Sequence, residues 1–486
     1  MRLALTLEES FQAARRASSQ VRVRSGFTTG GQIVFQDIEA NFLVGAYADI
    51  ASRVVAKGTY VACGPYRVPH ARMVGRALLS HTIPSTAFRG FGIPQISWAI
   101  ESQMDQAARQ LGIDRLEIRL RNTPHYRDVL IPGDIPVDGD WAASLHKAAA
   151  AVGWGTPLAA NHGRGIALGL KNSSSVTVSF VIVRLHHDGS ATILSGTSDM
   201  GQGARTVFTQ IAARELGLPL GKVAVVMGDT ATVPFDASTS ASRSTVFMGN
   251  AILSACNDIK AQLKKLACEE YSLSESAVTV EPGKVCLPER EISYAELLRQ
   301  AFGPARGEVI AVGTSRAKYQ PDHPLGGKAA FWEVVSVACE VEVDGDTGAI
   351  LVEKLVIVGD VGKAINPQHV EVQDEGAAVM GLGHTLMEQL ILDEGGRVLN
   401  LGALDYRIPT IQDIPDAMHS ELVENGDGPG PYGAKGTGES GILVIAPAIG
   451  SAVQEATGVT IRDLPLTPER VWRALAEEDS QSIGRL

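Results

Sequence analysis

The chain has 486 residues, of which 45% are hydrophobic and 20% charged, and its formal net charge at pH 7 is -11. A chain of this length is too long for one ordinary hydrophobic core, so two or three globular domains are expected. The acidic balance, without a Lys/Arg-rich run that could neutralise phosphates, excludes a nucleic-acid-binding protein.

The sequence predicts neither an export signal nor a membrane span. The N-terminus lacks the long apolar core of a signal peptide, and no apolar run is long enough for a transmembrane helix. The five cysteines are widely spaced without a CxxC pattern, which favours neither a disulfide framework nor a zinc or iron–sulfur site. We therefore expect a cytoplasmic protein.

Residues 1–150 are predicted to form a first domain. Short strand-like runs occur over 21–62, and apolar side chains recur at helical spacing over 95–111. Residues 121–140 contain three prolines and two glycines with little periodicity, which is typical of a linker. The domain boundary is expected between about 125 and 160.

Residues 151–486 are predicted to form a second domain. Strands are expected at 176–185, 191–194, 222–227, 335–343 and 350–358, and helices at 204–216, 249–266 and 367–386. Strands and helices in this mixed order indicate the α+β class, with mixed sheets, packed helices and two elongated lobes.

The turn at 86–95 places Arg89 between two aromatic residues, and Pro94 begins the next helix. An arginine beside a glycine can bind an oxyanion, and Phe91 can stack on a flat ring. The alternative is that both phenylalanines belong to the core and that Arg89 forms a surface ion pair.

Residues 197–206 lie between a predicted strand end and a predicted helix start, where free backbone N–H groups favour an anionic ligand. Gly201 and Gly203 permit close approach, Gln202 offers a donor and an acceptor, and Thr206 ends the segment. The segment is neither a P-loop nor a GxGxxG motif, and a glycine turn that only caps the helix is the alternative.

A hydroxyl-rich run over 236–245 precedes the helix expected at 249–266. Ala241, Ser242 and Ser244 belong to this run, whose small groups can line a phosphate or pterin site. The alternative is that the run only caps the helix.

Residues 433–441 place Glu439 in a glycine-rich turn that leads directly into the apolar segment 442–446. A carboxylate beside an apolar segment is energetically unfavourable, so its presence indicates a function. Glycines such as Gly436 let the backbone approach a ligand closely. Lys435 adds a positive charge nearby. The pattern favours a general base, and an ordinary surface turn is the alternative.

In order and content, these segments resemble the molybdenum-binding subunit of the molybdenum hydroxylases, the xanthine dehydrogenase and aldehyde oxidoreductase family. The resemblance covers nearly the whole chain. Its segments are AFRGFGxPQ at 87–95, MGQGxxT at 200–206, ASxST at 241–245, DVGKAINP at 360–367 with Gln373, DYRIP at 405–409 and KGTGE at 435–439.

The resemblance implies a role for each candidate residue. Glu439 matches the catalytic glutamate that accepts a proton while water-derived oxygen is inserted into an electron-poor carbon, and Phe91 matches an aromatic residue that packs on the substrate ring. The pterin dithiolene holds molybdenum, so no residue is expected to ligate the metal. The expected molybdopterin contacts are Arg89, Gly201, Gln202, Gly203, Thr206, Ala241, Ser242, Ser244, Gln373, Lys435 and Gly436.

The resemblance also implies partners. The cofactor is expected to be molybdopterin cytosine dinucleotide with molybdenum, and 2Fe-2S clusters and FAD are expected on partner subunits. Family members carry a GGQ-type loop and a Gly-Gly-Phe-Gly-Gly loop ahead of the stretch that residues 2–9 resemble, and this sequence has neither loop in that place. We expect a second molybdopterin-binding subunit to supply them, as in nicotinate dehydrogenase-like members, so that this subunit alone is inactive; a truncated sequence is the alternative.

Only differences from relatives narrow the range of candidate substrates. Carbon monoxide dehydrogenases carry a cysteine in the segment that corresponds to 85–89, and its absence disfavours CO. Xanthine-type enzymes place a phenylalanine and an arginine where this chain has 172–175 and 56–58, so a purine sandwich is disfavoured. An N-heteroaromatic ring or an aldehyde remains. A non-catalytic structural subunit or degenerate paralogue is the alternative function, and a nicotinamide- or flavin-binding chain is disfavoured because no Rossmann fingerprint occurs.

Overall fold

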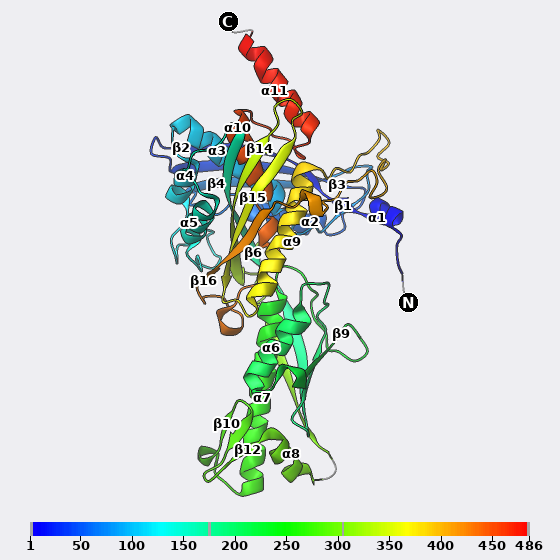
Figure 1. The fold of residues 1–486 in the computed structure, drawn as a ribbon. Coiled ribbons are helices and arrows are strands. Elements are labelled where there is room, and N and C mark those ends of the chain that lie inside the picture. Colours follow the sequence, from blue (N-terminus) through cyan, green and yellow to red (C-terminus); the bar gives the residue numbers. More distant parts are fainter. Residues whose placement is uncertain (1–2, 174–175, 304–305, 484–486) are drawn as a thin grey trace.

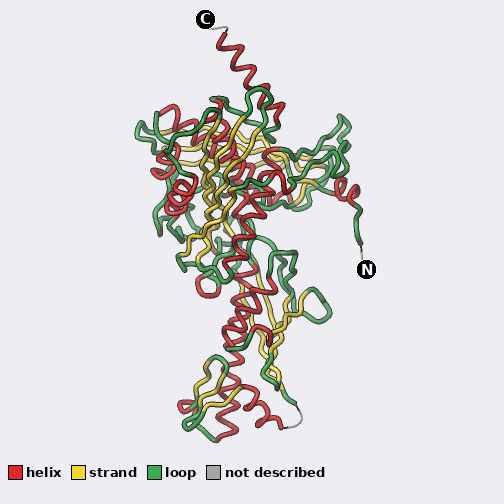
Figure 2. Tube along the Cα trace, in the orientation of Figure 1, coloured by secondary structure: helices red, strands yellow, loops and turns green. Residues whose placement is uncertain are grey.

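The computed structural model describes residues 3–173, 176–303 and 306–483, and it forms an elongated molecule of two bodies (Figure 1). The upper body contains the sheets formed by the first strands and by β14 to β16. The lower body surrounds the long helix α7 (Ser244–Tyr271). Figure 2 shows helices and strands interspersed in both bodies, which confirms the predicted α+β class.

The first sheet has the order β2-β3-β4, formed by β2 (Ser18–Phe27), β3 (Ile33–Gly45) and β4 (His70–Leu79). β3 runs antiparallel to β2 and parallel to β4. A parallel pair needs a crossover connection, and the helix α2 (Ala51–Tyr60) lies within it. The short strands β1 (Arg15–Arg16) and β5 (Ser85–Thr86) pair beside this sheet.

Helix α2 shows that the prediction of short strands throughout 21–62 was wrong for its last part. The buried residues Ala51, Val54, Val55 and Gly58 recur every three to four positions, which is the spacing of one helix face. A Cβ added to Gly58 would lie 2.9 Å from the carbonyl oxygen of Gly92, so α2 closely contacts the segment that precedes the next helix.

That next helix, α3 (Ile93–Leu111), confirms the predicted helix and is anchored by buried charges. Arg119 of α4 (Arg115–Asn122) pairs with Glu101 of α3 at 2.8 Å, and both side chains are almost fully buried. Glu101 also accepts a hydrogen bond from the backbone N–H of Leu168 at 2.9 Å. Because an unpaired charge here would be costly, the cluster holds α3 against the central sheet.

The central sheet has the order β16-β15-β14-β6, in which β14 runs antiparallel to β6 and β15, and β15 runs parallel to β16. The register places Lys171 of β6 directly opposite Glu333 of β14. Helices α5, α9 and α10 pack against this sheet. The bounds are β6 (His162–Ser173), β14 (Phe331–Val343), β15 (Ile350–Gly362), β16 (Ala417–Glu424), α5 (Trp141–Val152), α9 (Pro367–Leu386) and α10 (Ile445–Thr457).

The lower body contains a further four-stranded sheet, in the order β13-β7-β8-β9, whose own hydrophobic core is closed by α6 and α7. The predicted strands at 176–185, 191–194 and 222–227 and the predicted helix at 204–216 are all confirmed here. The bounds are β7 (Val178–His186), β8 (Ala191–Ser195), β9 (Val223–Met227), β13 (Glu308–Arg316) and α6 (Ala204–Leu216).

The remaining elements are small or peripheral. A three-stranded meander with α8 lies at the far end of α7, and α11 extends from the opposite end of the molecule (Figure 1). Among the described residues, no helix combines the length and apolarity that crossing a membrane requires. The bounds are α1 (Leu7–Ala13), β10 (Thr279–Glu281), β11 (Lys284–Cys286), β12 (Glu291–Ser293), α8 (Tyr294–Phe302), α11 (Pro468–Ile483) and the 3-10 turns η1 (Leu220–Lys222), η2 (Glu275–Ala277), η4 (Ile411–Asp413), η5 (Pro431–Gly433) and η6 (Ser440–Ile442).

Candidate active site

Arg89, which follows β5, joins three of the predicted site segments. Its Nε donates to the carbonyl oxygen of Gly438 at 2.7 Å, and its Nη2 donates to the carbonyl oxygen and Oε1 of Gln373 at 2.9 and 3.3 Å. The backbone N–H of Gly90 donates to Oε2 of Glu439 at 3.0 Å. Segments 86–95 and 433–441 and the helix α9 therefore meet at the Glu439 carboxylate.

The backbone beside Arg89 is held in an unusual conformation. Gly90, Phe91 and Gly92 have φ values of 90°, 50° and 89°, all in the left-handed region. This region is costly for a residue with a side chain such as Phe91, by about 1–3 kcal/mol, and such residues cluster at functional sites. The two glycines explain how the chain can make this turn.

The hydroxyl-rich run is also strained, and a buried arginine braces it. Ala241 and Ser242 have φ values of 51° and 53°. Arg243 pairs with Asp236 at 2.8 Å and donates to the carbonyl oxygen of Ser238 at 2.8 Å. Arg243 was not among the residues predicted from the sequence, although a charged residue inside a run of small hydroxyls was a visible signal.

Ser242 and Ser244 have different surroundings. Ser242 Oγ donates to Oε2 of Glu333 at 2.8 Å, and a Cβ added to Gly436 would overlap the Ser242 carbonyl oxygen. The run 236–245 therefore packs directly against the segment that carries Glu439. Ser244 begins α7, and its buried hydroxyl has no hydrogen-bond partner within the described part of the chain.

The predicted loop at 197–206 adjoins the same region. Gln202 accepts a hydrogen bond from the N–H of Met200 at 2.7 Å and donates to the carbonyl oxygen of Ser198 at 2.9 Å, so its amide orders the loop. Thr239 of the hydroxyl-rich run also donates to that carbonyl, at 2.7 Å. Gly201 has a φ of 103°, and Thr206 is exposed in the first turn of α6.

Gly203 connects this loop to helix α9. Its φ is 80°, and an added Cβ would overlap the ring of His369. His369 lies one helical turn before Gln373, which Arg89 contacts. The Nδ1 atom of His369 is buried without a hydrogen-bond partner in the described structure. The predicted segments are thus linked to one another by direct contacts.

Lys435 has acidic partners of its own. Its ammonium group donates to Asp138 Oδ1 at 2.9 Å and to Asp360 Oδ2 at 3.0 Å, and the residue is buried. These ion pairs tie the segment before Glu439 to β15 and to the loop before α5. The role of Lys435 as a cofactor contact stays a prediction, because its charge is already balanced within the protein.

Three charged residues beside Glu439 were not selected from the sequence. Lys171 Nζ lies 2.5 Å from Glu333 Oε1 and 3.6 Å from Glu439 Oε1. Lys57 of α2 donates to the carbonyl oxygen of Asn172 at 3.3 Å. Burial lowers the pKa of Lys57 to about 8, and the nearby Lys171 acts in the same direction. Lys171 and Glu333 could have been noticed as charges that interrupt the apolar runs within β6 and β14.

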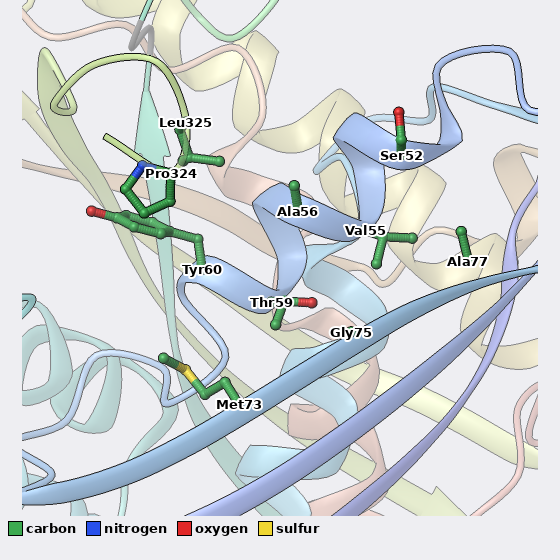
Figure 3. A pocket seen from close by; sticks show the side chains of 10 residues that line it. All are labelled: Ser52, Val55, Ala56, Thr59, Tyr60, Met73, Gly75, Ala77, Pro324 and Leu325. Carbon is green, nitrogen blue, oxygen red and sulfur yellow. The ribbon is translucent and has the colours of Figure 1, made fainter. Parts of the chain in front are cut away.

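A cavity of about 460 Å³ lies between α2, β4 and the turn at Pro324 and Leu325 (Figure 3). Its lining from α2 includes Ala56 and Tyr60, and β4 contributes Met73. None of its lining residues is one of the predicted site residues. The cluster around Glu439 is therefore defined by its contacts and not by this cavity.

Comparison with known proteins agrees with this arrangement. The chain matches the family model of the molybdopterin cofactor-binding domain over residues 140–415, and a second model of that description matches residues 1–123.

Two bacterial proteins and one crystal structure illustrate the similarity. A probable xanthine dehydrogenase subunit from Bacillus subtilis is 32% identical over 97% of this chain and 64% of its own length. A putative xanthine dehydrogenase molybdenum-binding subunit of Escherichia coli is also 32% identical over the same shares. The structure of quinoline 2-oxidoreductase from Pseudomonas putida 86 superposes with a TM-score of 0.84 and 25% identity, over 97% of this chain and 64% of that one.

The chain therefore belongs to the molybdopterin-binding large subunits of the molybdenum hydroxylase family, as its motifs predicted. It spans 64% of the length of the relatives named above.

Proposed function

We propose that this chain is the catalytic, cofactor-binding subunit of a molybdenum-dependent hydroxylase or dehydrogenase. The single observation that carries the proposal is the position of Glu439. Its carboxylate lies where segments 86–95, 236–245 and 433–441 and the helix α9 meet, between the N–H of Gly90 and the ammonium group of Lys171. Its side chain is 15% exposed, so it is sheltered but reachable.

The residues around Glu439 fit a pterin cofactor. Buried polar atoms without partners in the described structure occur at Ser244 Oγ and His369 Nδ1, and a bound polar ligand would satisfy such atoms. The absence of a Cβ at Gly203 lets the His369 ring approach the loop closely, because an added Cβ would overlap that ring. Residues Arg89, Gln202, Ser242 and Gln373 surround the same region, and we assign cofactor binding to them together with Gly201, Gly203, Thr206, Ala241, Ser244, Lys435 and Gly436.

In this proposal the protein residues bind the cofactor, orient the substrate and accept a proton. When bound, the cofactor supplies the two-electron chemistry by which water-derived oxygen enters an electron-poor carbon. Glu439 accepts the proton that must be released, and the N–H of Gly90 fixes the orientation of its carboxylate. Phe91 offers a flat apolar surface for the substrate ring.

The substrate class that we propose is an N-heteroaromatic ring, with an aldehyde as the second choice. The names of the relatives support the first, because xanthine and quinoline are both N-heteroaromatic compounds. Segments 172–175 and 56–58 still disfavour the purine-binding mode, and residues 174–175 lie outside the described residues. The cofactor form that we propose is molybdopterin cytosine dinucleotide.

The partners that we propose are an iron–sulfur subunit with 2Fe-2S clusters, an FAD subunit and a second molybdopterin-binding polypeptide. This chain spans 64% of the length of each of these relatives. Two electrons leave each turnover, and among the five cysteines of this chain none forms a cluster that could carry an iron–sulfur centre.

The test compares Glu439→Gln with wild type in the complex purified with its partner chains. Molybdenum content should be unchanged, whereas turnover of N-heteroaromatic substrates and aldehydes should fall by about 10²- to 10⁴-fold, the usual contribution of a general base. Glu469→Gln, at a carboxylate that is 72% exposed, is the matched control. Turnover of Glu439→Gln within about tenfold of wild type would refute the assigned role, and absence of molybdenum from the wild-type complex would favour a structural subunit.

A further inference from the structure

Lys171 and Glu333 form a buried ion pair whose position the sheet register determines. They face each other across β6 and β14, and each side chain is 1% exposed. Their neighbours along both strands are buried and largely apolar. A buried ion pair seldom stabilises a fold more than apolar residues of similar size would, so this pair calls for another explanation.

The pair is connected directly to Glu439. Lys171 Nζ contacts Glu333 Oε1 at 2.5 Å and Ser173 Oγ at 3.0 Å, and it lies 3.6 Å from Glu439 Oε1. Glu333 uses its other oxygen to accept the hydroxyl of Ser242 at 2.8 Å. One ammonium group is therefore shared by two carboxylates, one fully buried and one at the candidate active site.

Other charged groups face this cluster from three further elements. Lys57 approaches from α2, Arg89 from the turn after β5, and Asp374 from α9. Burial opposes the charged form of Lys171, but Glu333 and Glu439 outweigh it and raise the pKa of Lys171, so this group stays protonated.

We propose that Lys171 and Glu333 are positioning residues that set the ionisation of Glu439. This inference rests on the proposed function, in which Glu439 is the general base. Lys171 keeps the Glu439 carboxylate negatively charged and in place, and Glu333 limits the strength of that effect by balancing the ammonium charge.

Both members of the pair are needed for this purpose. A general base must be ionised before it can accept a proton, and a cation within about 4 Å favours the ionised form. An unbalanced cation at that distance would also make the carboxylate a weaker base. Glu333, closer to Lys171 than Glu439 is, offsets part of the positive charge.

The test measures kcat/KM against pH for Lys171→Met, Glu333→Gln and Lys171→Arg in the molybdenum-loaded complex. The acidic limb of the profile should move to higher pH in Lys171→Met and to lower pH in Glu333→Gln, by about one to three pH units each. Lys171→Arg keeps the charge and should leave the limb near its wild-type position. A merely structural pair would not shift the limb in opposite directions.

A second readout does not depend on turnover. The carboxylate band of Glu439 in infrared difference spectra, assigned by its absence from Glu439→Gln, should titrate in the same direction as the limb of each variant. If Lys171→Met does not fold, the test uses Glu333→Gln and the charge-neutral double variant Lys171→Met with Glu333→Gln. The limb of the double variant should lie at higher pH than that of Glu333→Gln, because the cation has been removed. The inference would be overturned if the acidic limbs did not move, or if both single variants moved the limb in the same direction. The proposed function is judged separately, because it stands as long as Glu439→Gln is inactive.

Discussion

Lys57 provides a pH-dependent test of the electrostatics around Glu439. Its ammonium group donates to the carbonyl oxygen of Asn172 at 3.3 Å, and within the described residues no carboxylate lies within ion-pair distance of it. Burial, together with Lys171, lowers its pKa from the ordinary 10.5 to about 8. Lys57 is therefore a cation that the folded protein holds at a cost.

The two pKa values give the size and the sign of that cost. In the unfolded chain the lysine titrates at 10.5, so the difference of about 2.5 corresponds to about 3 kcal/mol at about 1.4 kcal/mol per pH unit. Between pH 8 and 10.5 the unfolded state binds more protons, so the stability of the wild type rises with pH across this window. Lys57→Met should raise the free energy of unfolding by up to about 3 kcal/mol at pH 7, and the gain should vanish above pH 10.5.

Equilibrium urea unfolding at pH 7 and at pH 10.5 measures this difference, provided that the slope with denaturant is the same for variant and wild type. Lys265→Met, at a lysine that is 78% exposed on α7, is the control and should change stability little at either pH. Two results would refute the assignment of a costly buried charge. Lys57→Met could be no more stable than wild type at pH 7, or it could be stabilised equally at both pH values.

Three further changes test how the site is built. Gly436→Ala adds a Cβ that overlaps the Ser242 carbonyl oxygen and should lower molybdenum content, whereas Gly345→Ala, with open space around its Cβ, should not; equal molybdenum in both would contradict the close contact. Arg243→Met breaks the buried ion pair with Asp236 and should lower the free energy of unfolding by about 3–5 kcal/mol. The control Arg473→Met, at an exposed arginine, should lower it by about 0–1 kcal/mol. Similar urea midpoints for the two variants would argue against a stabilising role of Arg243. Gln202→Ala removes the hydrogen bonds to Met200 and Ser198 and should reduce cofactor retention more than it alters the pH dependence of turnover; unchanged molybdenum occupancy would count against this contact.

The elements with clear local signals could be predicted from the sequence. Helix α6 ends at Leu216, and Gly217, which has a φ of 64°, caps it, so its predicted and observed ends agree. Helix α9 begins at Pro367 behind the cap of Asn366, and its predicted range also agrees. Helix α2 was missed because neither of its ends carries a local signal: no side chain caps its start, and Val61 rather than a glycine follows its last residue.

The candidate site could be predicted only where its residues lie in sequence motifs. Arg89, Gln373 and Glu439 belong to such motifs, and the structure brings them together. Lys171 and Glu333 are 162 positions apart, and their pairing depends on the register of β6 against β14, which no local pattern encodes. The partners of Lys435 likewise depend on the folding of three distant segments.

The most direct test of the central proposal is anomalous diffraction at the molybdenum absorption edge from crystals of the loaded complex. We expect a single molybdenum peak next to the Glu439 carboxylate, in the region that Arg89 and Gln373 border. A molybdenum peak remote from Glu439 in crystals of an active complex would contradict the assignment of Glu439 as the base.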